Sequence, residues 1–462
     1  MKYDVIIVGA GPSGIFTTLE LTKRKDIRIL LLEKGKSLEE RLQLVKNYEK
    51  SEKLLNVLSP TICGWGGAGA FSDGKLTLST EVGGFLHRYL SKSELTELIE
   101  YADKCYVQHG APEHIYGSDI SEIEKLKIKA IQNNLKLIPT RIRHLGTDKC
   151  PYILQNFKNS LEGNADIRFN SRVESIICDD SKVRGVITDA GKEFLSDFVV
   201  ISPGRGGAEW LDRECRRMGL TTLINPVDIG IRVELPAATM AFITDVVYEP
   251  KLLFYSKQFD DQVRTFCVNP YGEVVQEFNE GIYTVNGHSY TTRKSDNTNF
   301  AILVSTSFTK PFNEPISYGK YVARLANFLS EGVIIQRLGD LLKGRRSTQE
   351  RVGRGIVVPT LRTAIPGDLS FVLPYRFLVN ILEMLMALDR FAPGVCSEHT
   401  LLYGIEVKFY SLQLKLTKSL ETEVKNLFAV GDGAGVSRGL IQASVSGIMA
   451  AREIMKRLNN SH

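Results

Sequence analysis

The sequence predicts an α/β protein, in which both ends of the chain form one parallel-sheet domain and the middle forms an inserted α+β domain. Two stretches predict this class, because each end of the chain reads as an apolar strand, a glycine-rich turn and a helix. The length agrees, since 462 residues are about three times the size of a common domain. We therefore expect one domain at 1–225 plus 400–462, and the inserted domain at 226–399.

The N-terminus has the element order of a dinucleotide-binding unit, in the stretch YDVIIVGAGPSGIFTTLELTKRKDIRILLLEKG. Its expected elements are a strand at 3–8, a helix at 15–24 and a strand at 27–32. Gly9 allows a tight turn, Gly11 lets the backbone approach a pyrophosphate, and Gly14 lets the helix pack closely on the strand. Glu33 ends the second strand, where a carboxylate accepts hydrogen bonds from a ribose and repels a 2′-phosphate. Either FAD or NAD fits this half of a site.

The C-terminus carries a second strand, turn and helix, in the stretch KNLFAVGDGAGVSRGLIQASVSGIMAAREIMKRL. The expected strand is 427–430, and the helix after Arg438 carries small residues that permit close packing: Ala443, Ser444, Gly447, Ala450 and Ala451. A strand ending in Gly-Asp here resembles the ribityl-binding motif of FAD-dependent oxidoreductases, which implies that Asp432 holds a ribityl or pyrophosphate-proximal oxygen. The resemblance also implies that the helix N-terminus faces the flavin N1–C2=O edge, where its dipole stabilises negative charge. An ordinary acidic N-cap is the alternative.

Two central stretches complete this prediction. FVVISPGRGGAEW, at 198–210, reads as a strand that returns to the nucleotide domain and ends in a glycine-rich turn at Gly204. The residues before it alternate as a meander of short strands, in which Val173 stands where the related β-layer contacts adenine with its backbone. GRGGAE has the wrong spacing for a second fingerprint, so the sequence indicates a single dinucleotide site, and that site is assigned to FAD.

The stretch CGWGGAGAFSDGK, at 63–75, is rich in glycine and follows the first unit and a charged helix. Bare backbone in such a loop lets N–H groups approach the flavin N5 and O4, and we expect Trp65 and Phe71 to wall the ring. A glycine-rich packing turn is the alternative.

The dispersed motifs together resemble one group, the largely uncharacterised bacterial and archaeal FAD-dependent dehydrogenases with two domains and a single dinucleotide site. The motifs are VGAGPSG, GWGGAGAFSDGKL, RHLGTDK, TFCVNPYGEVV, VNGHSY, GRRST, PGDLS, LLYGIEVKFYS and GDGAGVSRGLIQAS. The chain departs from the pattern at Asn269 and Tyr271, about where the family has a second Cys and a Gly pair, and at Ala70, where it has Thr. These departures put any Cys-pair chemistry in doubt.

The resemblance implies a Rossmann-like FAD-binding domain of the glutathione-reductase type with an inserted α+β substrate domain. The residues expected to bind FAD are Gly9, Gly11, Pro12, Ser13, Gly14, Glu33, Lys34, Gly66, Gly67, Ala68, Ser72, Val173, Gly204, Gly431, Asp432, Gly439, Leu440 and Gln442.

Candidate catalytic residues lie in the inserted domain. His288 and Tyr290 are candidates for proton transfer, and Cys267 is a candidate redox thiol. Arg345 and Arg346 belong to a basic cluster at 337–362 that suits a carboxylate or phosphate. A structural histidine, a small buried Cys and a solvated basic surface are the respective alternatives.

Composition sets the broader expectations. The chain is 43% hydrophobic and 24% charged with a net charge of +5, values of an ordinary globular protein that require neither nucleic acid nor a membrane. Seven dispersed cysteines without a CxxC pair disfavour disulfides and a metal site and suit the cytoplasm. The longest apolar run, from Leu369, is interrupted by Pro374, Arg376, Asn380 and Glu383, so we expect no membrane span. The apolar start belongs to the fingerprint, so we expect no targeting segment.

These observations predict an FAD-dependent dehydrogenase or reductase that transfers a hydride between FAD and an organic small-molecule substrate, anionic substrates included. Without a nicotinamide domain, electrons come from transiently docked NAD(P)H or a redox partner protein. A flavin-dependent RNA-modifying enzyme and a non-catalytic FAD-binding protein are the alternatives, although sparse aromatic residues in the basic cluster disfavour RNA.

Overall fold

The computed structural model describes residues 2–48, 63–72, 74–179, 181–223, 227–279, 281–306, 314–408 and 412–460. The chain divides into two compact units. Unit 1 comprises residues 1–113, 143–225 and 410–462, and unit 2 comprises residues 114–142 and 226–409. The expected boundary at 225/226 lies outside the described residues.

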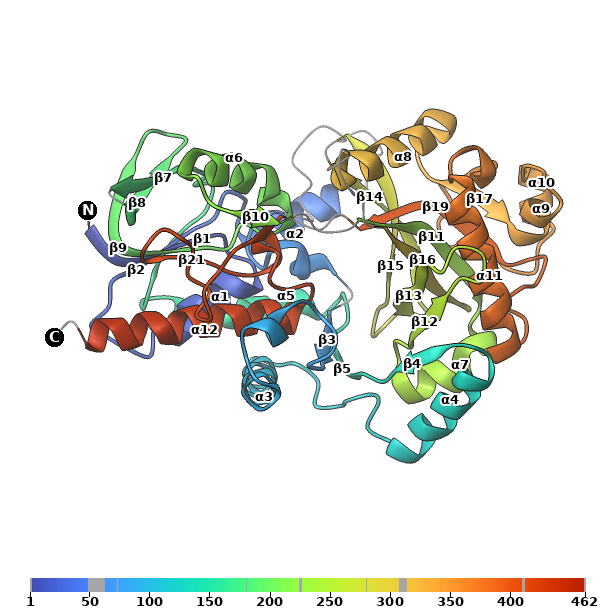
Figure 1. The fold of residues 1–462 in the computed structure, drawn as a ribbon, viewed down its shortest axis with the longest axis horizontal. Helices are drawn as coiled ribbons and strands as arrows, with labels where there is room; N and C mark the ends of the chain where they lie inside the picture. Colours follow the sequence, from blue (N-terminus) through green and yellow to red (C-terminus); the bar gives the residue numbers. More distant parts are fainter. Residues whose placement is uncertain are drawn as a thin grey trace. The chain divides into compact units, whose positions relative to one another are not determined.

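Unit 1 is built on a seven-stranded sheet with the order β6-β2-β1-β9-β8-β7, with β21 also paired to β9 (Figure 1). Its strands are β1 (Lys2–Val8), β2 (Ile29–Leu32), β6 (Asp166–Arg168), β7 (Val173–Asp179), β8 (Lys182–Thr188), β9 (Glu193–Ile201) and β21 (Leu427–Ala429). β6, β2, β1, β9 and β21 are parallel, whereas β7, β8 and the start of β9 form an antiparallel meander. The predicted parallel sheet and meander are therefore confirmed.

Six helices belong to unit 1 among its described residues: α1 (Pro12–Leu21), α2 (Leu38–Tyr48), α3 (Lys92–Gln108), α5 (Cys150–Leu161), α6 (Ala208–Met218) and α12 (Leu440–Asn459). Shorter elements are η1 (Gly67–Phe71), η2 (Leu86–Arg88), η3 (Arg205–Gly207), η5 (Asp432–Ala434), β3 (Lys75–Leu78), β10 (Thr222–Leu223) and β20 (Gln413–Leu414). α1 begins at Pro12, three residues before the predicted start, because a proline fits the first turn of a helix, where its missing N–H has no partner to lose.

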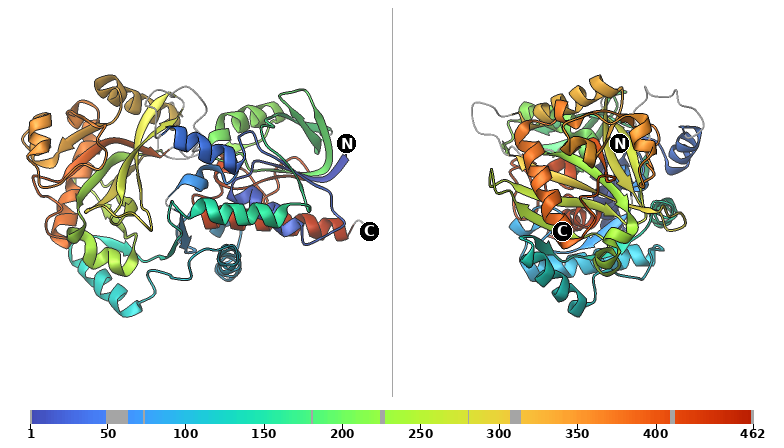
Figure 2. Two further views of the ribbon diagram at one scale, coloured as in Figure 1. Left: turned by 180° about the vertical axis from the view of Figure 1, so that it is seen from behind. Right: turned by 90° about the vertical axis from the view of Figure 1, so that its right-hand side faces the viewer.

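α1 and α12 pack against each other on the sheet of unit 1 (Figures 1 and 2). The crossing is close, since a Cβ added at Gly447 would lie 2.2 Å from the Ser13 carbonyl oxygen. Thr17 Oγ1 bridges the two helices by donating to the carbonyls of Ser13 and Gly447. The small residues predicted to permit close packing of the C-terminal helix serve that purpose here.

Unit 2 is built on an eight-stranded sheet with the order β18-β17-β19-β11-β16-β13-β12-β4. Its strands are β4 (Lys136–Ile138), β11 (Val227–Pro236), β12 (Lys251–Tyr255), β13 (Gln262–Asn269), β16 (Asn297–Thr306), β17 (Ile334–Arg337), β18 (Ile365–Pro366) and β19 (Leu401–Lys408). The hairpin of β14 (Glu273–Asn279) and β15 (Ile282–His288) lies on one face of this sheet, and helices cover the other (Figures 1 and 2).

The helices of unit 2 are α4 (Ile120–Gln132), α7 (Ala237–Val247), α8 (Pro315–Ser330), α9 (Leu338–Leu342), α10 (Gln349–Gly353), α11 (Tyr375–Phe391) and the short η4 (Leu369–Phe371). β5 (Arg141–His144) marks the return of the chain to unit 1. Within the ranges that the structure describes, no helix combines the length and the apolar character needed to span a bilayer.

Residues 114–142, which the sequence analysis placed in the nucleotide domain, group with unit 2. The reason is long-range pairing, since β4 pairs with β12 and α4 buries Ile123 and Leu126 in the same core as Met240 of α7. Nothing in the local pattern of 114–142 reveals a strand partner more than 100 positions away, so sequence periodicity misses this assignment.

Candidate functional site

Four chain segments leave the sheet of unit 1 at the carboxyl ends of its parallel strands. β1 leads to Gly9, β2 to Glu33, β9 to Ser202 and β21 to Gly431. β2 and β9 lie on opposite sides of β1, so the direction of winding reverses there. In open α/β sheets, ligands bind outside the carboxyl ends of the strands at such a reversal. The candidate site is therefore this edge of the sheet.

The three fingerprint glycines have different surroundings. A Cβ on Gly9, whose φ is +103°, would lie 2.3 Å from the Ser202 carbonyl oxygen, and one on Gly14 would lie 1.9 Å from the Gly9 carbonyl oxygen. At Gly11 a Cβ would meet no described atom within 4 Å. Gly9 and Gly14 are thus needed for packing, whereas the space at Gly11 is open. At the start of α1, no side chain of the described residues caps the helix, which leaves its first N–H groups directed at that space.

The Glu33 carboxylate ties the fingerprint turn to the glycine-rich loop. Its Oε2 accepts from the Ala10 N–H at 2.7 Å, and its Oε1 accepts from Gly35 and Gly64 at 2.8 and 3.0 Å. A carboxylate has about four acceptor positions, so these three bonds leave Oε2 with capacity for one further donor. A ribose hydroxyl is a donor of that kind, and the predicted role of Glu33 is compatible with its structural one.

Arg41 of α2 organises the same loop and was missed by the sequence analysis. It is almost fully buried, and its guanidinium donates to the carbonyls of Trp65 and Gly67. Burial lowers the pKa of Arg41 to about 10, and the nearby Glu33 carboxylate opposes that shift. An arginine on a charged helix gives no local signal of this contact, because the partner carbonyls are more than 20 residues away.

The glycine-rich loop lies against the fingerprint turn. The Gly66 N–H donates to the Ala10 carbonyl at 2.8 Å, and a Cβ on Gly67 would lie 3.2 Å from the Gly11 Cα. Ala68 lies in η1, and Ser72 closes it by donating from Oγ to the Gly69 carbonyl. The loop at 64–72 therefore reaches the open space at Gly11, as a loop bordering the cofactor should.

The expected role of Trp65 is wrong. Trp65 is 0% exposed, packs edge-on against Phe169 and donates its indole N–H to the Leu154 carbonyl. A side chain that is buried on all sides by protein anchors the loop in the core and does not wall a ring. Phe71 is only partly buried, and its ring lies 4.8 Å from the Arg41 guanidinium.

The C-terminal motif adds two features to the edge. Gly431 has a φ of +77° and donates its N–H to Ser446, while Asp432 accepts from Ser437 Oγ at 2.6 Å. Gly439 and Leu440 form the start of α12, where no described side chain caps the helix. Its first N–H groups are thus available to an acceptor.

Gln442 stands in the first turn of α12 and is 3% exposed. Its Nε2 donates to the carbonyls of Thr77, Ser79 and Val82, which holds the turn after β3 against the helix. Its Oε1 has no hydrogen-bond partner among the described residues. A buried acceptor without a donor is costly, so this oxygen suits a ligand that brings an N–H or O–H group.

The remaining predicted cofactor residues lie around the same edge. The chain just before Val173 is joined to the end of β2, since the Ser171 N–H donates to the Glu33 carbonyl at 2.9 Å. Lys34 donates to the Gly206 carbonyl at 2.6 Å, and a Cβ on Gly433 would lie 2.7 Å from the Gly204 nitrogen. The structure thus brings the predicted cofactor residues together, and their contact with FAD stays a prediction.

The candidate catalytic residues fall into two groups in unit 2. Cys267 lies at a bulge of β13 with a φ of +46°, and its Sγ lies 3.8 Å from Asn286 Oδ1 on β15, the strand that ends at His288. Tyr290 follows shortly after, with the Arg293 guanidinium 4.4 Å from its ring centre. Arg345 and Arg346 lie between α9 and α10, where Arg345 pairs with Asp340 at 2.8 Å and Arg346 is exposed.

A buried ion pair beside Cys267 was not predicted. Arg232 of β11 and Glu406 of β19 are both 0% exposed and form two hydrogen bonds at 2.8 and 3.0 Å. Arg232 also donates to the Cys267 carbonyl at 3.1 Å. Burial disfavours the charged guanidinium, but the Glu406 carboxylate outweighs it and raises the pKa of Arg232. The available signal was the charged residues inside the apolar runs DIGIRVEL and YGIEVKF.

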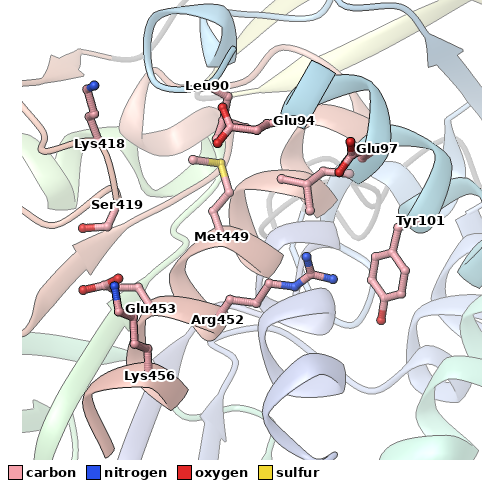
Figure 3. A pocket seen from close by; sticks show the side chains of 11 residues that line it. Leu90, Glu94, Glu97, Tyr101, Lys418, Ser419, Met449, Arg452, Glu453 and Lys456 are labelled. Atoms are coloured by element: carbon pink, nitrogen blue, oxygen red, sulfur yellow. The ribbon is translucent and has the colours of Figure 1, made fainter. Parts of the chain in front are cut away.

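A separate cavity of about 480 Å³ lies between α3 and α12 (Figure 3). Tyr101, Glu94 and Glu97 line it from α3, and Met449, Arg452 and Glu453 line it from α12. None of the predicted site residues lines this cavity. The arginine that lines it, Arg452, already donates a hydrogen bond to Glu20 at 2.9 Å.

Comparison with known proteins identifies the family. Residues 226–409 match the model described as "FAD-dependent protein, C-terminal domain-like". An uncharacterized protein of Clostridium beijerinckii is 30% identical over 487 residues, covering 99% of this chain and 82% of that protein. The chain belongs to the family of FAD-dependent proteins. Its cofactor is FAD, and because flavins carry hydride and electron transfer, the protein is an FAD-dependent oxidoreductase.

Similar solved structures include glycine oxidase from Bacillus cereus ATCC 14579, which is 14% identical with a TM-score of 0.39, over 98% of this chain and 95% of that one. L-proline dehydrogenase from P. horikoshii is 13% identical with a TM-score of 0.44, over 99% of this chain and 94% of that one.

The edge of unit 1 fits the cofactor, because it offers open space at Gly11, two helix N-termini without side-chain caps and the buried acceptor Gln442 Oε1.

Proposed function

We propose that the protein transfers a hydride between FAD, held at the carboxyl edge of unit 1, and an organic substrate. The observation that carries this proposal is the convergence of four strand ends on a space that is open at Gly11 but tightly packed at Gly9 and Gly14. Such an arrangement is expected where a backbone must approach a pyrophosphate while the flanking helix and strand stay in contact.

Each part of the edge has a role toward the cofactor. The N–H groups at the start of α1 bind the pyrophosphate, and Glu33 uses its remaining acceptor position for the ribose. Asp432 holds a ribityl hydroxyl. At the start of α12, helix N–H groups donate to a flavin carbonyl and Gln442 Oε1 accepts from a flavin N–H, while the helix dipole favours negative charge on the ring. FAD supplies the centre that accepts or donates the hydride.

On the substrate side, His288 holds or moves the proton that accompanies the hydride, with Tyr290 as the second proton-transfer candidate and Cys267 as a thiol next to them. Arg345 already pairs with Asp340 at 2.8 Å, so we do not assign the anionic group of the substrate to it. Lys251, Arg264 and Lys408 lie 5.5, 5.0 and 5.8 Å from the centre of the Phe266 ring. Each of these three cations also pairs with a carboxylate, Glu249, Asp228 and Glu406 respectively, so their charges are balanced within the protein and give no preference for an anionic substrate.

The test is an anaerobic titration of the flavin spectrum with NADH, NADPH and a panel of hydroxy, amino and unsaturated carboxylic acids. We expect at least one of these compounds to bleach the flavin. Bound flavin that none of them reduces would contradict the proposal and favour a non-catalytic FAD-binding protein.

A further inference from the structure

A surface of unit 2 combines unpaired arginines with exposed aliphatic side chains. We define the arginine surface as residues 346–362, which include α10 and the loop that follows it (Figure 1). It carries four arginines, Arg346, Arg351, Arg354 and Arg362, against the single acid Glu350. Among the described residues, Arg346, Arg354 and Arg362 are exposed and form no ion pair. Three positive charges therefore face solvent without a carboxylate partner.

Two aliphatic side chains lie between these arginines in the sequence. Ile356 is 70% exposed and Val358 is 71% exposed, whereas Val357 between them is buried. Exposing two large apolar side chains to solvent beside three unpaired charges does not stabilise the folded protein. Apolar groups surrounded by arginine are the composition of protein–protein interfaces, in which arginine is enriched.

Hydrogen bonds to buried groups fix the loop that follows α10. Thr360 donates from Oγ1 to buried Glu234 at 2.5 Å and accepts from the Val274 N–H at 2.9 Å. Asn297 Nδ2 donates to the Val358 carbonyl at 2.8 Å, and the Tyr403 hydroxyl donates to Glu234 Oε2. A loop fixed by buried groups displays its exposed side chains in one arrangement, which lowers the entropy lost on binding.

We propose that the arginine surface docks an acidic electron-carrier protein. This inference rests on the proposed function, because a flavin that oxidises its substrate must pass the electrons on, and the chain has one dinucleotide fingerprint. Each turnover leaves two electrons on FAD, so two carrier molecules each take one electron and the accompanying proton goes to solvent. A small patch suits such a partner, because electron-transfer complexes form weak interfaces below about 1,200 Å² that are selected by charge.

Two other anionic partners fit this surface less well. Single-stranded RNA is bound by stacking bases on aromatic rings, and the exposed apolar residues of the arginine surface are aliphatic. A lipid surface is bound by a helix with a continuous apolar face, whereas α10 has only 5 residues. Both remain outcomes that the test separates.

The test compares two triple variants of the full-length FAD-loaded protein. R346Q/R354Q/R362Q removes the three unpaired charges, and R28Q/R184Q/R216Q removes three exposed charges from unit 1. The probe is an acidic Rieske-type [2Fe–2S] ferredoxin, whose reduction potential lies above that of plant-type ferredoxins and lets it accept electrons from a reduced flavin. The small neutral acceptor is p-benzoquinone. Each protein is reduced anaerobically with dithionite, and its reoxidation by each acceptor is followed by stopped flow at several salt concentrations.

We expect reoxidation by ferredoxin to slow about tenfold or more in R346Q/R354Q/R362Q, with a weaker salt dependence, and to stay within about twofold of wild type in the control. Benzoquinone should oxidise all three proteins equally. An equal loss in both variants, no reaction of wild type with ferredoxin, or a loss of RNA or anionic-vesicle binding instead would overturn the docking proposal. If benzoquinone reoxidises the flavin but no substrate reduces it, the result contradicts the proposed function alone. Titration calorimetry with oxidised ferredoxin then still tests docking.

Discussion

Two neighbouring glycines of the fingerprint should respond in opposite ways to the same substitution. A Cβ at Gly11 meets no described atom within 4 Å, and the φ of Gly11 is −77°, which any residue adopts. Gly11→Ala should therefore change the stability of the FAD-free protein by less than about 1 kcal/mol. The added methyl group occupies the space proposed for the pyrophosphate. Overpacking of this kind costs about 1–3 kcal/mol, which corresponds to a roughly 5- to 150-fold rise in the Kd for FAD.

Gly14→Ala is the matched variant. Its Cβ would lie 1.9 Å from the Gly9 carbonyl oxygen and 2.9 Å from Ser202 Oγ, so the helix must shift even without FAD. We expect the FAD-free protein to lose about 1–3 kcal/mol or more. Urea unfolding followed by tryptophan fluorescence measures this directly, because both tryptophans, Trp65 and Trp210, lie in unit 1. FAD affinity follows from flavin fluorescence quenching. The reasoning is refuted if Gly11→Ala destabilises the FAD-free protein as much as Gly14→Ala, or binds FAD as tightly as wild type.

Three further predictions concern buried charges. Glu406→Ala should lower the free energy of unfolding by about 3–5 kcal/mol, because it leaves Arg232 buried and unpaired. The control is Arg293→Ala, at an exposed pair, which should lower the free energy of unfolding by less than about 1 kcal/mol in the same urea series. Burial raises the pKa of Glu234 above its ordinary 4.5, so the native state binds more protons than the unfolded state between the two pKa values. Stability should therefore fall as the pH rises through that window, and a Glu234→Gln variant with an unchanged slope would contradict this. Arg41→Met should leave the Trp65 and Gly67 carbonyls without their donor, which speeds amide hydrogen exchange at 64–67; unchanged exchange there would argue against the role of Arg41.

The sequence predicted the parts of the fold that are encoded locally. The strands of unit 1, the fingerprint turn and the close packing of α12 depend on residues within a single stretch, where periodicity and glycine spacing carry the information. Gln442 was identified from its motif, although nothing in the motif showed that its Nε2 holds the turn after β3 while its Oε1 stays unpaired.

The parts that the sequence analysis missed depend on contacts across long stretches of chain. Arg41 reaches the carbonyls of the glycine-rich loop, Arg232 meets Glu406, and β4 joins the sheet of unit 2 through β12. Trp65 was misplaced for the same reason. An aromatic residue between glycines has the same pattern whether it faces a cofactor or the core, and only the surrounding packing distinguishes the two.

The central claim is that FAD binds at the carboxyl edge of unit 1. A crystal structure of the FAD-loaded protein tests it most directly. The account predicts the pyrophosphate beside Gly11 at the N-terminus of α1, the ribose at Glu33, and a polar edge of the flavin within hydrogen-bond distance of Gln442 Oε1. Density for FAD at any other place, such as the cavity between α3 and α12, would contradict the account.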